Sequence, residues 1–410
     1  MMLTYVFVSI VTLFGVAVRT LLFAGDVPQN PTFTTLVTTP LAIEGLSGDE
    51  TGNLYTTGRA TFPALCPVWR INKAKPELVV VGFIPNPVAC NPSGITFDSA
   101  GNLYIADGAG GGVIWVLKPD AANPPTATLF ASGVPGTNGI AFDRNGNLWT
   151  GDGTTGQGRV WKISTSGVVQ EIFRIQPLAN EVNLDATGTG RVGRDVRSLP
   201  PGTITVTPTS RNAANTLGSQ PLVANGVAFF PNVKGKDKRL KKDREQDILH
   251  IADTARGAIW KAEFNSDGTL KSRTNCDTTF TENTLCLENI FVSHPILEGA
   301  DGIALDRDGN IWVSANERNA IGFITQEREV IEFFRNDPDP TTRLRNTGPL
   351  EFPTSPFLMG RLFCTSNSDG NRRDNFPNAA GEINAAGPGV GKISCLDQEL
   401  IVPGLPLPVR

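Results

Sequence analysis

The stretch Ser93-Gly-Ile-Thr-Phe-Asp-Ser-Ala-Gly-Asn-Leu-Tyr-Ile-Ala-Asp107 decides the fold, because the chain repeats it. It returns as Asn138-Gly-Ile-Ala-Phe-Asp-Arg-Asn-Gly-Asn-Leu-Trp-Thr-Gly-Asp152 and as Asp301-Gly-Ile-Ala-Leu-Asp-Arg-Asp-Gly-Asn-Ile-Trp-Val-Ser-Ala315. Each copy is an apolar run, an Asp-x-x-Gly-Asn turn and a second apolar run, which is typical of a β-hairpin. The chain is therefore built from repeated hairpins.

Three weaker copies complete the set, and they begin at Glu44, Asn225 and Ser355. Further apolar runs follow the hairpins at 112–117, 158–163 and 258–261. A hairpin with two more strands makes one four-stranded propeller blade. The sequence therefore predicts an all-β fold, a six-bladed β-propeller with four-stranded blades and long inserted loops.

The repeat also sets the expected domain organisation. Residues 29–410 form a single propeller, with insertions at about 176–220 and 233–246 where the spacing between copies is too long. We interpret the first insertion as a long ordered loop that lies over one face of the ring. The second is a basic run that we interpret as an extended, solvated hairpin tip, and an adhesive patch for anionic surfaces is the alternative. Residues 33–39 could supply the outer strand of the last blade and so close the ring.

Composition limits the possible partners. The chain has 43 Gly and 30 Pro but only 3 Met and 2 His, which suits short strands joined by tight turns. Its net charge of −4 gives no basic surface for a phosphate backbone, so no nucleic-acid partner is expected. We expect a monomer that takes a small-molecule substrate.

Residues 1–28 indicate export. Leu3 to Val18 is almost wholly apolar, and small residues follow at Ala24 and Gly25, as in a signal peptide. No Lys or Arg precedes the apolar core, so an uncleaved membrane anchor is the alternative. No later segment is long enough to cross a membrane, and a periplasmic or extracellular location follows.

Six cysteines suit an oxidising compartment. Pairing of neighbours along the sequence is the simplest arrangement, and six buried thiols are the alternative. The predicted pairs are Cys66 with Cys90, Cys276 with Cys286, and Cys364 with Cys395.

The residue that opens each repeat is the candidate functional position, because the first strand of a blade lines the central channel. These six blade-start residues all carry oxygen donors: Glu44, Ser93, Asn138, Asn225, Asp301 and Ser355. Calcium, or another hard divalent cation, takes about six to eight oxygen ligands and needs no Cys or His. The alternative is that these Asx-Gly pairs merely start turns.

The set Glu44-Gly, Asn138-Gly, Asn225-Gly and Asp301-Gly resembles the gluconolactonase and regucalcin (senescence marker protein) family of six-bladed propellers, and more distantly the diisopropylfluorophosphatases and paraoxonases. The resemblance implies that these four residues surround a catalytic Ca²⁺. The chain departs from the family at Ser355, where relatives often carry Asn, and in its long 176–220 insertion.

The function that follows is a Ca²⁺-dependent hydrolase of lactones or related esters. Asp301 would activate water or attack directly, and His294 is a second catalytic candidate, whereas His250 lies within an apolar strand and is expected to be structural. Asn138, Ser93 and Ser355 would contact substrate. One alternative is a non-catalytic binding propeller of the NHL type with a structural Ca²⁺. A metal-free, strictosidine-synthase-like propeller is disfavoured because all four metal positions hold oxygen donors.

Overall fold

The computed structural model describes most of the chain. The described ranges are 27–60, 65–85, 89–176, 223–230, 247–265, 267–275, 283–297, 299–341, 345, 348–368 and 390–406. The predicted leader and the two predicted insertions lie almost entirely outside them. In the described ranges there is no α-helix, and none of the helical segments there could span a bilayer.

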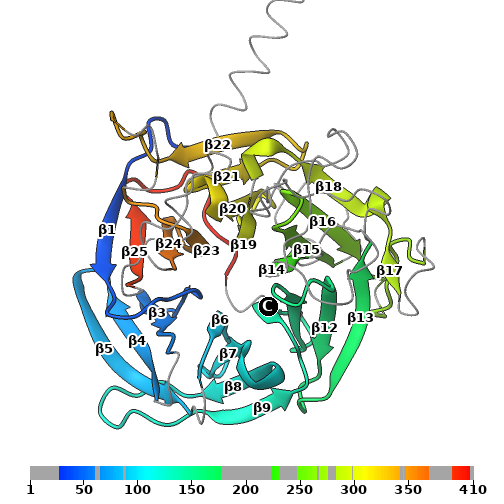
Figure 1. The fold of residues 1–410 in the computed structure, drawn as a ribbon, viewed down its shortest axis with the longest axis horizontal. Coiled ribbons are helices and arrows are strands. Elements are labelled where there is room, and N and C mark those ends of the chain that lie inside the picture. The colour runs from blue at the N-terminus through cyan, green and yellow to red at the C-terminus, as the bar shows by residue number, and fades with distance from the viewer. Residues whose placement is uncertain are drawn as a thin grey trace, which may run out of the picture.

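Six antiparallel sheets stand in a ring around a central axis, which confirms the predicted six-bladed propeller (Figure 1). Each inner strand pairs with the next strand of its hairpin, and the predicted third strands are present. Blade 1 contains β2 (Ser47–Gly48), β3 (Asn53–Thr57), β4 (Cys66–Asn72) and β5 (Lys75–Ile84). Blade 2 contains β6 (Pro92–Phe97), β7 (Leu103–Asp107), β8 (Val113–Leu117) and β9 (Thr128–Ser132). Blade 3 contains β10 (Thr137–Phe142), β11 (Leu148–Asp152), β12 (Arg159–Ile163), β13 (Val169–Ile175) and β17 (Thr284–Leu285).

The remaining blades follow the same plan. Blade 4 contains β14 (Ala224–Phe230), β15 (Ile248–Asp253), β16 (Ala258–Glu263) and β18 (Ile290–Ser293). Blade 5 contains β19 (Ala300–Leu305), β20 (Ile311–Ala315), β21 (Ala320–Ile324) and β22 (Val330–Arg335). Blade 6 contains β23 (Pro353–Met359), β24 (Leu362–Asn367), β25 (Lys392–Leu396) and β1 (Phe33–Thr38).

An Asp organises the hairpin turn in blades 1, 2, 3 and 5. In blade 3, Asp143 Oδ1 accepts the backbone N–H groups of Asn145 and Asn147, both at 2.9 Å. Its Oδ2 accepts the Asn147 side-chain amide at 2.9 Å and Trp149 Nε1 at 3.0 Å. Gly146 has φ 79°, a conformation that favours glycine. Asp49, Asp98 and Asp306 make the equivalent bonds in their own turns. Each accepts the backbone N–H groups of the residues two and four positions later and the side-chain amide of the Asn four positions later. These bonds explain the repeated Asp-x-x-Gly-Asn phrase.

The hydrophobic core lies between neighbouring blades. One cluster, for example, joins Trp149 and Phe173 of blade 3 to Val227, Leu249 and Trp260 of blade 4. Similar clusters fill the other five interfaces around the ring. Since each blade buries both faces against its neighbours, removal of one blade would expose two apolar surfaces.

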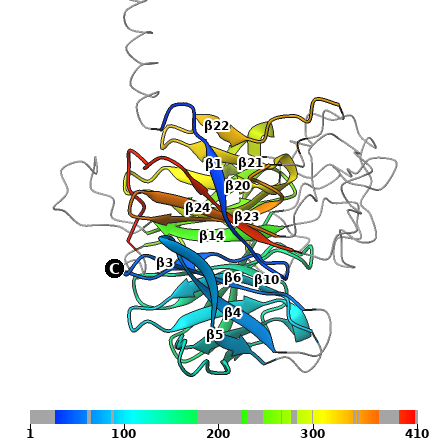
Figure 2. The same ribbon diagram turned by 90° about the vertical axis from the view of Figure 1, so that its left-hand side faces the viewer.

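Strand β1 closes the ring by pairing with β25, with Phe33 opposite Leu396 and Thr38 opposite Lys392. This confirms the prediction for residues 33–39. The ring of Phe33 packs against Phe333, Phe334 and Phe363 at centroid distances of 6.4, 4.8 and 5.7 Å. Figure 2 views the ring from this side, where β1 of blade 6 and β5 of blade 1 face the reader.

Blade 3 gains a fifth strand that the sequence pattern did not indicate. Strand β17 comes from the segment between β16 and β18 of blade 4, and it pairs in parallel with β13 through Arg174 opposite Thr284 (Figure 1). The long spacing between Asn225 and Asp301 therefore includes this second excursion as well as the predicted insertion at 233–246.

Two of the predicted disulfides are present. Cys364 and Cys395 link β24 to β25, and Cys66 and Cys90 link β4 to the segment before β6. Cys286 is also disulfide-bonded, but its predicted partner Cys276 lies outside the described residues. The bonds indicate an oxidising compartment.

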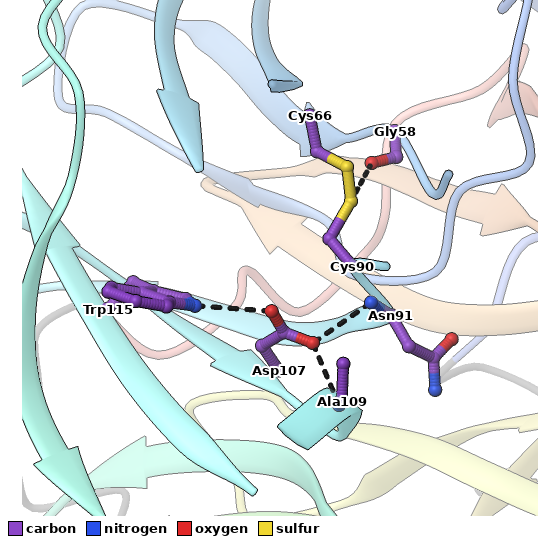
Figure 3. Close-up of a disulfide and its surroundings, with 7 residues drawn as sticks. All are labelled: Gly58, Cys66, Cys90, Asn91, Asp107, Ala109 and Trp115. Carbon is purple, nitrogen blue, oxygen red and sulfur yellow. Dashed lines mark hydrogen bonds between the residues drawn. A yellow bond between two sulfur atoms is a disulfide. The ribbon is translucent and has the colours of Figure 1, made fainter. Parts of the chain in front are cut away.

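Near Cys90, the buried carboxylate of Asp107 holds the entry to blade 2 (Figure 3). It accepts the backbone N–H of Asn91 at 2.9 Å and that of Ala109 at 2.9 Å, and Trp115 Nε1 donates to it at 3.1 Å. The disulfide and Asp107 together fix the segment that leads directly into Ser93.

The channel has one polar end and one apolar end. Beyond the blade-start residues, apolar side chains of the inner strands surround a cavity of about 110 Å³, which Leu405 also lines. The C-terminal segment crosses this end, since Leu405 donates its N–H to Leu305 and Gly404 donates to Gly360. The polar blade-start residues lie at the other end of the inner strands.

Candidate functional site

The blade-start residues form a continuous ring, and the glycine after five of them makes this possible. A Cβ on Gly94 would lie 2.5 Å from the carbonyl oxygen of Asn138, and one on Gly139 would lie 2.6 Å from Gly226 Cα. Gly45, Gly226 and Gly302 meet the next blade in the same way. None of these five glycines has a positive φ, so they do not start turns. They allow neighbouring inner strands to approach closely.

Blade 6 closes the ring against blade 1. The Thr354 hydroxyl donates to the carbonyl oxygen of Glu44 at 2.8 Å, and the Ser366 hydroxyl donates to the same oxygen. Gly302 of blade 5 in turn contacts Thr354 and Ser355. The backbones of all six blade-start residues thus follow one another around the channel.

Asn225 presents an unpaired oxygen. Its side chain is buried, with 6% exposed, and its Nδ2 donates to the Thr254 hydroxyl at 3.1 Å. Its Oδ1 is buried and has no hydrogen-bond partner among the described residues. Thr254 donates onward to the carbonyl oxygen of Ala300 at 2.7 Å, so it also ties Asn225 to the strand that carries Asp301. A buried amide oxygen without a donor is costly unless a ligand meets it.

Asp301 is held by a neighbouring amide. It is 4% exposed, and its Oδ2 accepts the Asn316 Nδ2 at 2.9 Å. Because Asn316 donates through Nδ2, its Oδ1 points away from the Asp301 carboxylate. This oxygen is buried without a hydrogen-bond partner in the described part of the chain. Asp301 therefore keeps its carboxylate beside a neutral donor.

The side chain of Asn138 packs closely against Gly153, where there is no room for a larger residue. A Cβ on Gly153 would lie 2.6 Å from Asn138 Nδ2 and 2.8 Å from Asn138 Cβ. The Ser93 hydroxyl lies against the same strand, with the carbonyl oxygens of Thr137 and Asn138 at 3.2 and 3.3 Å. Ser93 thus serves the junction of blades 2 and 3, and its predicted contact with substrate stays a prediction.

Ser355 differs from the other blade-start residues. It is partly exposed, and its described contacts are made by its backbone, whose N–H lies 3.2 Å from the Ser366 hydroxyl. Its predicted role in substrate binding is not tested by these contacts.

Glu44 forms an ion pair with Arg59, which follows the end of β3. The side chain of Glu44 is 9% exposed and that of Arg59 is 24% exposed. Arg59 Nη1 also lies 3.3 Å from the Ser368 hydroxyl, after β24 of blade 6. A permanent positive charge therefore stands beside one of the two predicted acidic ligands.

The two histidines have different settings. His250 is buried and packs edge-to-face on Phe291 at 5.8 Å, as expected for a structural residue. His294 lies just after β18, the outer strand of blade 4, and its Nδ1 accepts the backbone N–H of Ile296 at 3.2 Å. Burial lowers the pKa of His294, and the charge of Arg318 lowers it further. Its catalytic role stays a prediction.

Two further carboxylates lie at the ends of second strands on the same face. Asp152 and Asp253 are fully buried, and burial raises the pKa of each. Thr155 and Arg159 oppose this for Asp152, whereas Arg256 and Trp260 oppose it for Asp253. Asp152 pairs in register with Thr137, the residue before Asn138, and Asp253 pairs with Ala224, the residue before Asn225. Each carboxylate therefore lies on the strand next to an inner strand.

Sequence reasoning missed Arg59, Gly153, Thr254 and Asn316. A signal was present, because three of them directly follow the last residue of a second strand: Gly153 after Asp152, Thr254 after Asp253 and Asn316 after Ala315. This position packs against the blade-start residue of its own blade. Aligning the repeats one residue further would have identified it.

The donor set suits a hard divalent cation by its chemistry. Glu44 and Asp301 supply carboxylates, Asn138 and Asn225 supply amide oxygens, and the unpartnered Asn225 Oδ1 is the kind of atom that an ion would satisfy. In the described part of the chain no group of three or more His, Cys, Asp or Glu side chains is placed to hold a metal ion. The positive charge of Arg59, beside Glu44, opposes the ion.

Comparison with known proteins supports the fold. No family model and no curated protein matches the chain. Among solved structures, a luciferin-regenerating enzyme matches with a TM-score of 0.52 and 15% identity, over 92% of this chain and 97% of that one. A gluconolactonase from Xanthomonas campestris matches with 0.51 and 13%, over 92% of each chain. A calcium-binding protein, regucalcin, from Agrobacterium tumefaciens matches with 0.50 and 15%, over 90% and 95%.

These neighbours confirm the predicted resemblance at the level of architecture. At such identities the likeness shows the fold alone, and function has to be argued from the site. The chain is thus a six-bladed propeller similar in fold to gluconolactonases and regucalcin.

Proposed function

We propose that the protein is an exported, calcium-dependent hydrolase of lactones or related esters that acts as a monomer on a small-molecule substrate. The observation that carries the proposal is the buried, unpartnered Oδ1 of Asn225. It occurs on the strand next to Asp301, within a ring of blade-start residues rich in oxygen donors. The gluconolactonase and the calcium-binding regucalcin among the structural neighbours support the choice of chemistry.

The residues of the site have separate proposed roles in binding the ion and in hydrolysis. Glu44, Asn138, Asn225 and Asp301 would hold the ion, and a bound Ca²⁺ would polarise the carbonyl of the substrate. Asn316 keeps the Asp301 carboxylate in a fixed orientation through its 2.9 Å hydrogen bond. Asp301 then accepts the proton of the attacking water and returns it to the alkoxide that leaves when the acyl C–O bond breaks. If Asp301 attacks the carbonyl directly, the same bond breaks as the Asp301 ester forms, and water then hydrolyses that ester.

The first experiment is a panel of lactones and aryl esters assayed with the mature protein in Ca²⁺ and in chelator. We expect hydrolysis of at least one substrate class that chelator abolishes and that added Ca²⁺ restores. Calcium binding without turnover on any substrate would favour the non-catalytic propeller instead. Turnover that is indifferent to chelator would contradict the role of the ion.

Two substitutions then separate the base from the ligands. Asp301→Asn keeps the side-chain shape but removes a charge and the basic oxygen, so turnover should fall by about 10²- to 10⁴-fold even in excess Ca²⁺. Asn225→Asp adds a charge without moving the base and should retain measurable turnover. Both variants should keep the β-sheet circular-dichroism spectrum, since packing between blades holds the ring. Wild-type turnover in Asp301→Asn would exclude Asp301 as the catalytic group.

A further inference from the structure

Arg59 forms an ion pair with the blade-start residue Glu44. Arg59 follows Gly58 and is fixed there by its backbone N–H, which donates to the carbonyl oxygen of Ala42 at 2.9 Å. Its guanidinium therefore extends from the end of a second strand toward the mouth of the channel, where it meets both Glu44 and Ser368.

The ion pair compensates the buried charge of Glu44 in the metal-free protein. Glu44 is almost fully enclosed, and a carboxylate in such a place is costly unless an opposite charge or several donors compensate it. Asp301 is compensated partly by the neutral Asn316, whereas Glu44 has a full positive charge beside it. Arg59 thus stabilises the blade-start ring when no ion is bound.

The same contact opposes a metal ion. A guanidinium stays protonated at any relevant pH, so it cannot yield to a cation by losing a proton. When a metal ion binds, the Arg59 guanidinium has to move away from Glu44 or stay close to the ion. The first loses the ion pair and the second brings two positive charges together, so both cost free energy. Its side chain, which is 24% exposed, has solvent on one side to move into.

We propose that Arg59 is an internal counter-cation that occupies the Glu44 carboxylate in the metal-free protein and competes with the metal ion for it. This inference rests on the proposed cation site. It implies that the affinity of the ring for Ca²⁺ is set below what its four oxygen-donor residues would give alone. Binding of the ion and retention of the Arg59–Glu44 pair are therefore coupled.

The test compares wild type with Arg59→Gln by calorimetric titration with Ca²⁺ and by thermal unfolding in chelator. Glutamine keeps a donor for Glu44 and Ser368 but carries no charge. We expect Ca²⁺ to bind Arg59→Gln roughly tenfold more tightly or better, because the repulsion is gone. In chelator we expect its melting temperature to fall by about 2 °C or more, because Glu44 has lost its charge partner.

The matched control is Arg174→Gln. Arg174 is more buried than Arg59 and is paired with Glu171 at 2.6 Å, but it lies on β13, the fourth strand of blade 3. It should lower the melting temperature in chelator without changing the Ca²⁺ affinity. Equal or weaker binding by Arg59→Gln than by wild type would overturn the competition while leaving the calcium site intact. Absence of binding to both proteins at millimolar Ca²⁺ would overturn the calcium site and the inference together.

Discussion

At the scale of single residues, the glycine that follows five of the six blade-start residues is as informative as the blade-start residue itself. The sequence alone left open whether the Asx-Gly pairs begin turns, and the structure places four of these glycines inside inner strands that approach the next blade closely. Glu44, Asn138, Asn225 and Asp301 could be identified from the repeat. Arg59 could not, because its partner depends on where a long side chain extends after the repeat has ended.

The glycine ring makes a prediction of its own. Gly139→Ala would place a methyl group 2.6 Å from the backbone of Gly226, so strands β10 and β14 must separate. We expect a loss of about 1–3 kcal/mol in unfolding free energy and weaker Ca²⁺ binding, because Asn138 and Asn225 move apart. Urea denaturation and calorimetry measure the two effects.

Gly101→Ala is the control, since it has φ 79° but open space around it. It should cost about 1 kcal/mol and leave Ca²⁺ affinity unchanged. If both variants lost the same stability and kept the same affinity, close approach of the strands would not be what positions the site.

At the scale of elements, closure of the ring could be predicted but the fifth strand of blade 3 could not. Residues 33–38 are rich in β-forming residues, and a propeller needs a partner for its last open edge. Strand β17 has only two residues, Thr284 and Leu285, which is too short for any periodicity to show. Its pairing with β13 defines it as a strand, and that pairing cannot be recognised from the two residues themselves.

The closing strand should contribute strongly to stability. Phe33 is 8% exposed and packs on three phenylalanine rings from blades 5 and 6, so Phe33→Ala should cost about 3–5 kcal/mol. Leu129→Ala, on the outer strand of blade 2, removes a side chain that is 55% exposed and should change stability by less than about 0.5 kcal/mol. Denaturant unfolding of both variants checks this, and similar losses would mean that β1 does not close the ring.

At the scale of the whole molecule, a single repeated phrase accounts for most of the architecture. Six copies form six blades, fill six interfaces and bring residues from 44 to 355 to one end of the channel. The apolar opposite end, which Leu405 helps to fill, could not be foreseen because the C-terminal segment belongs to no repeat. The polar end is where the proposed chemistry lies, and it depends on all six blades being in place.

The most direct test of the central claim is a crystal structure of the mature protein grown or soaked with Ca²⁺. We expect one ion at the polar end of the channel, with oxygens of Glu44, Asn138, Asn225 and Asp301 at about 2.3–2.6 Å from it. In the same structure the Arg59 guanidinium should have withdrawn from Glu44. An ion bound elsewhere, or four side chains that do not share one ion at saturating Ca²⁺, would contradict it.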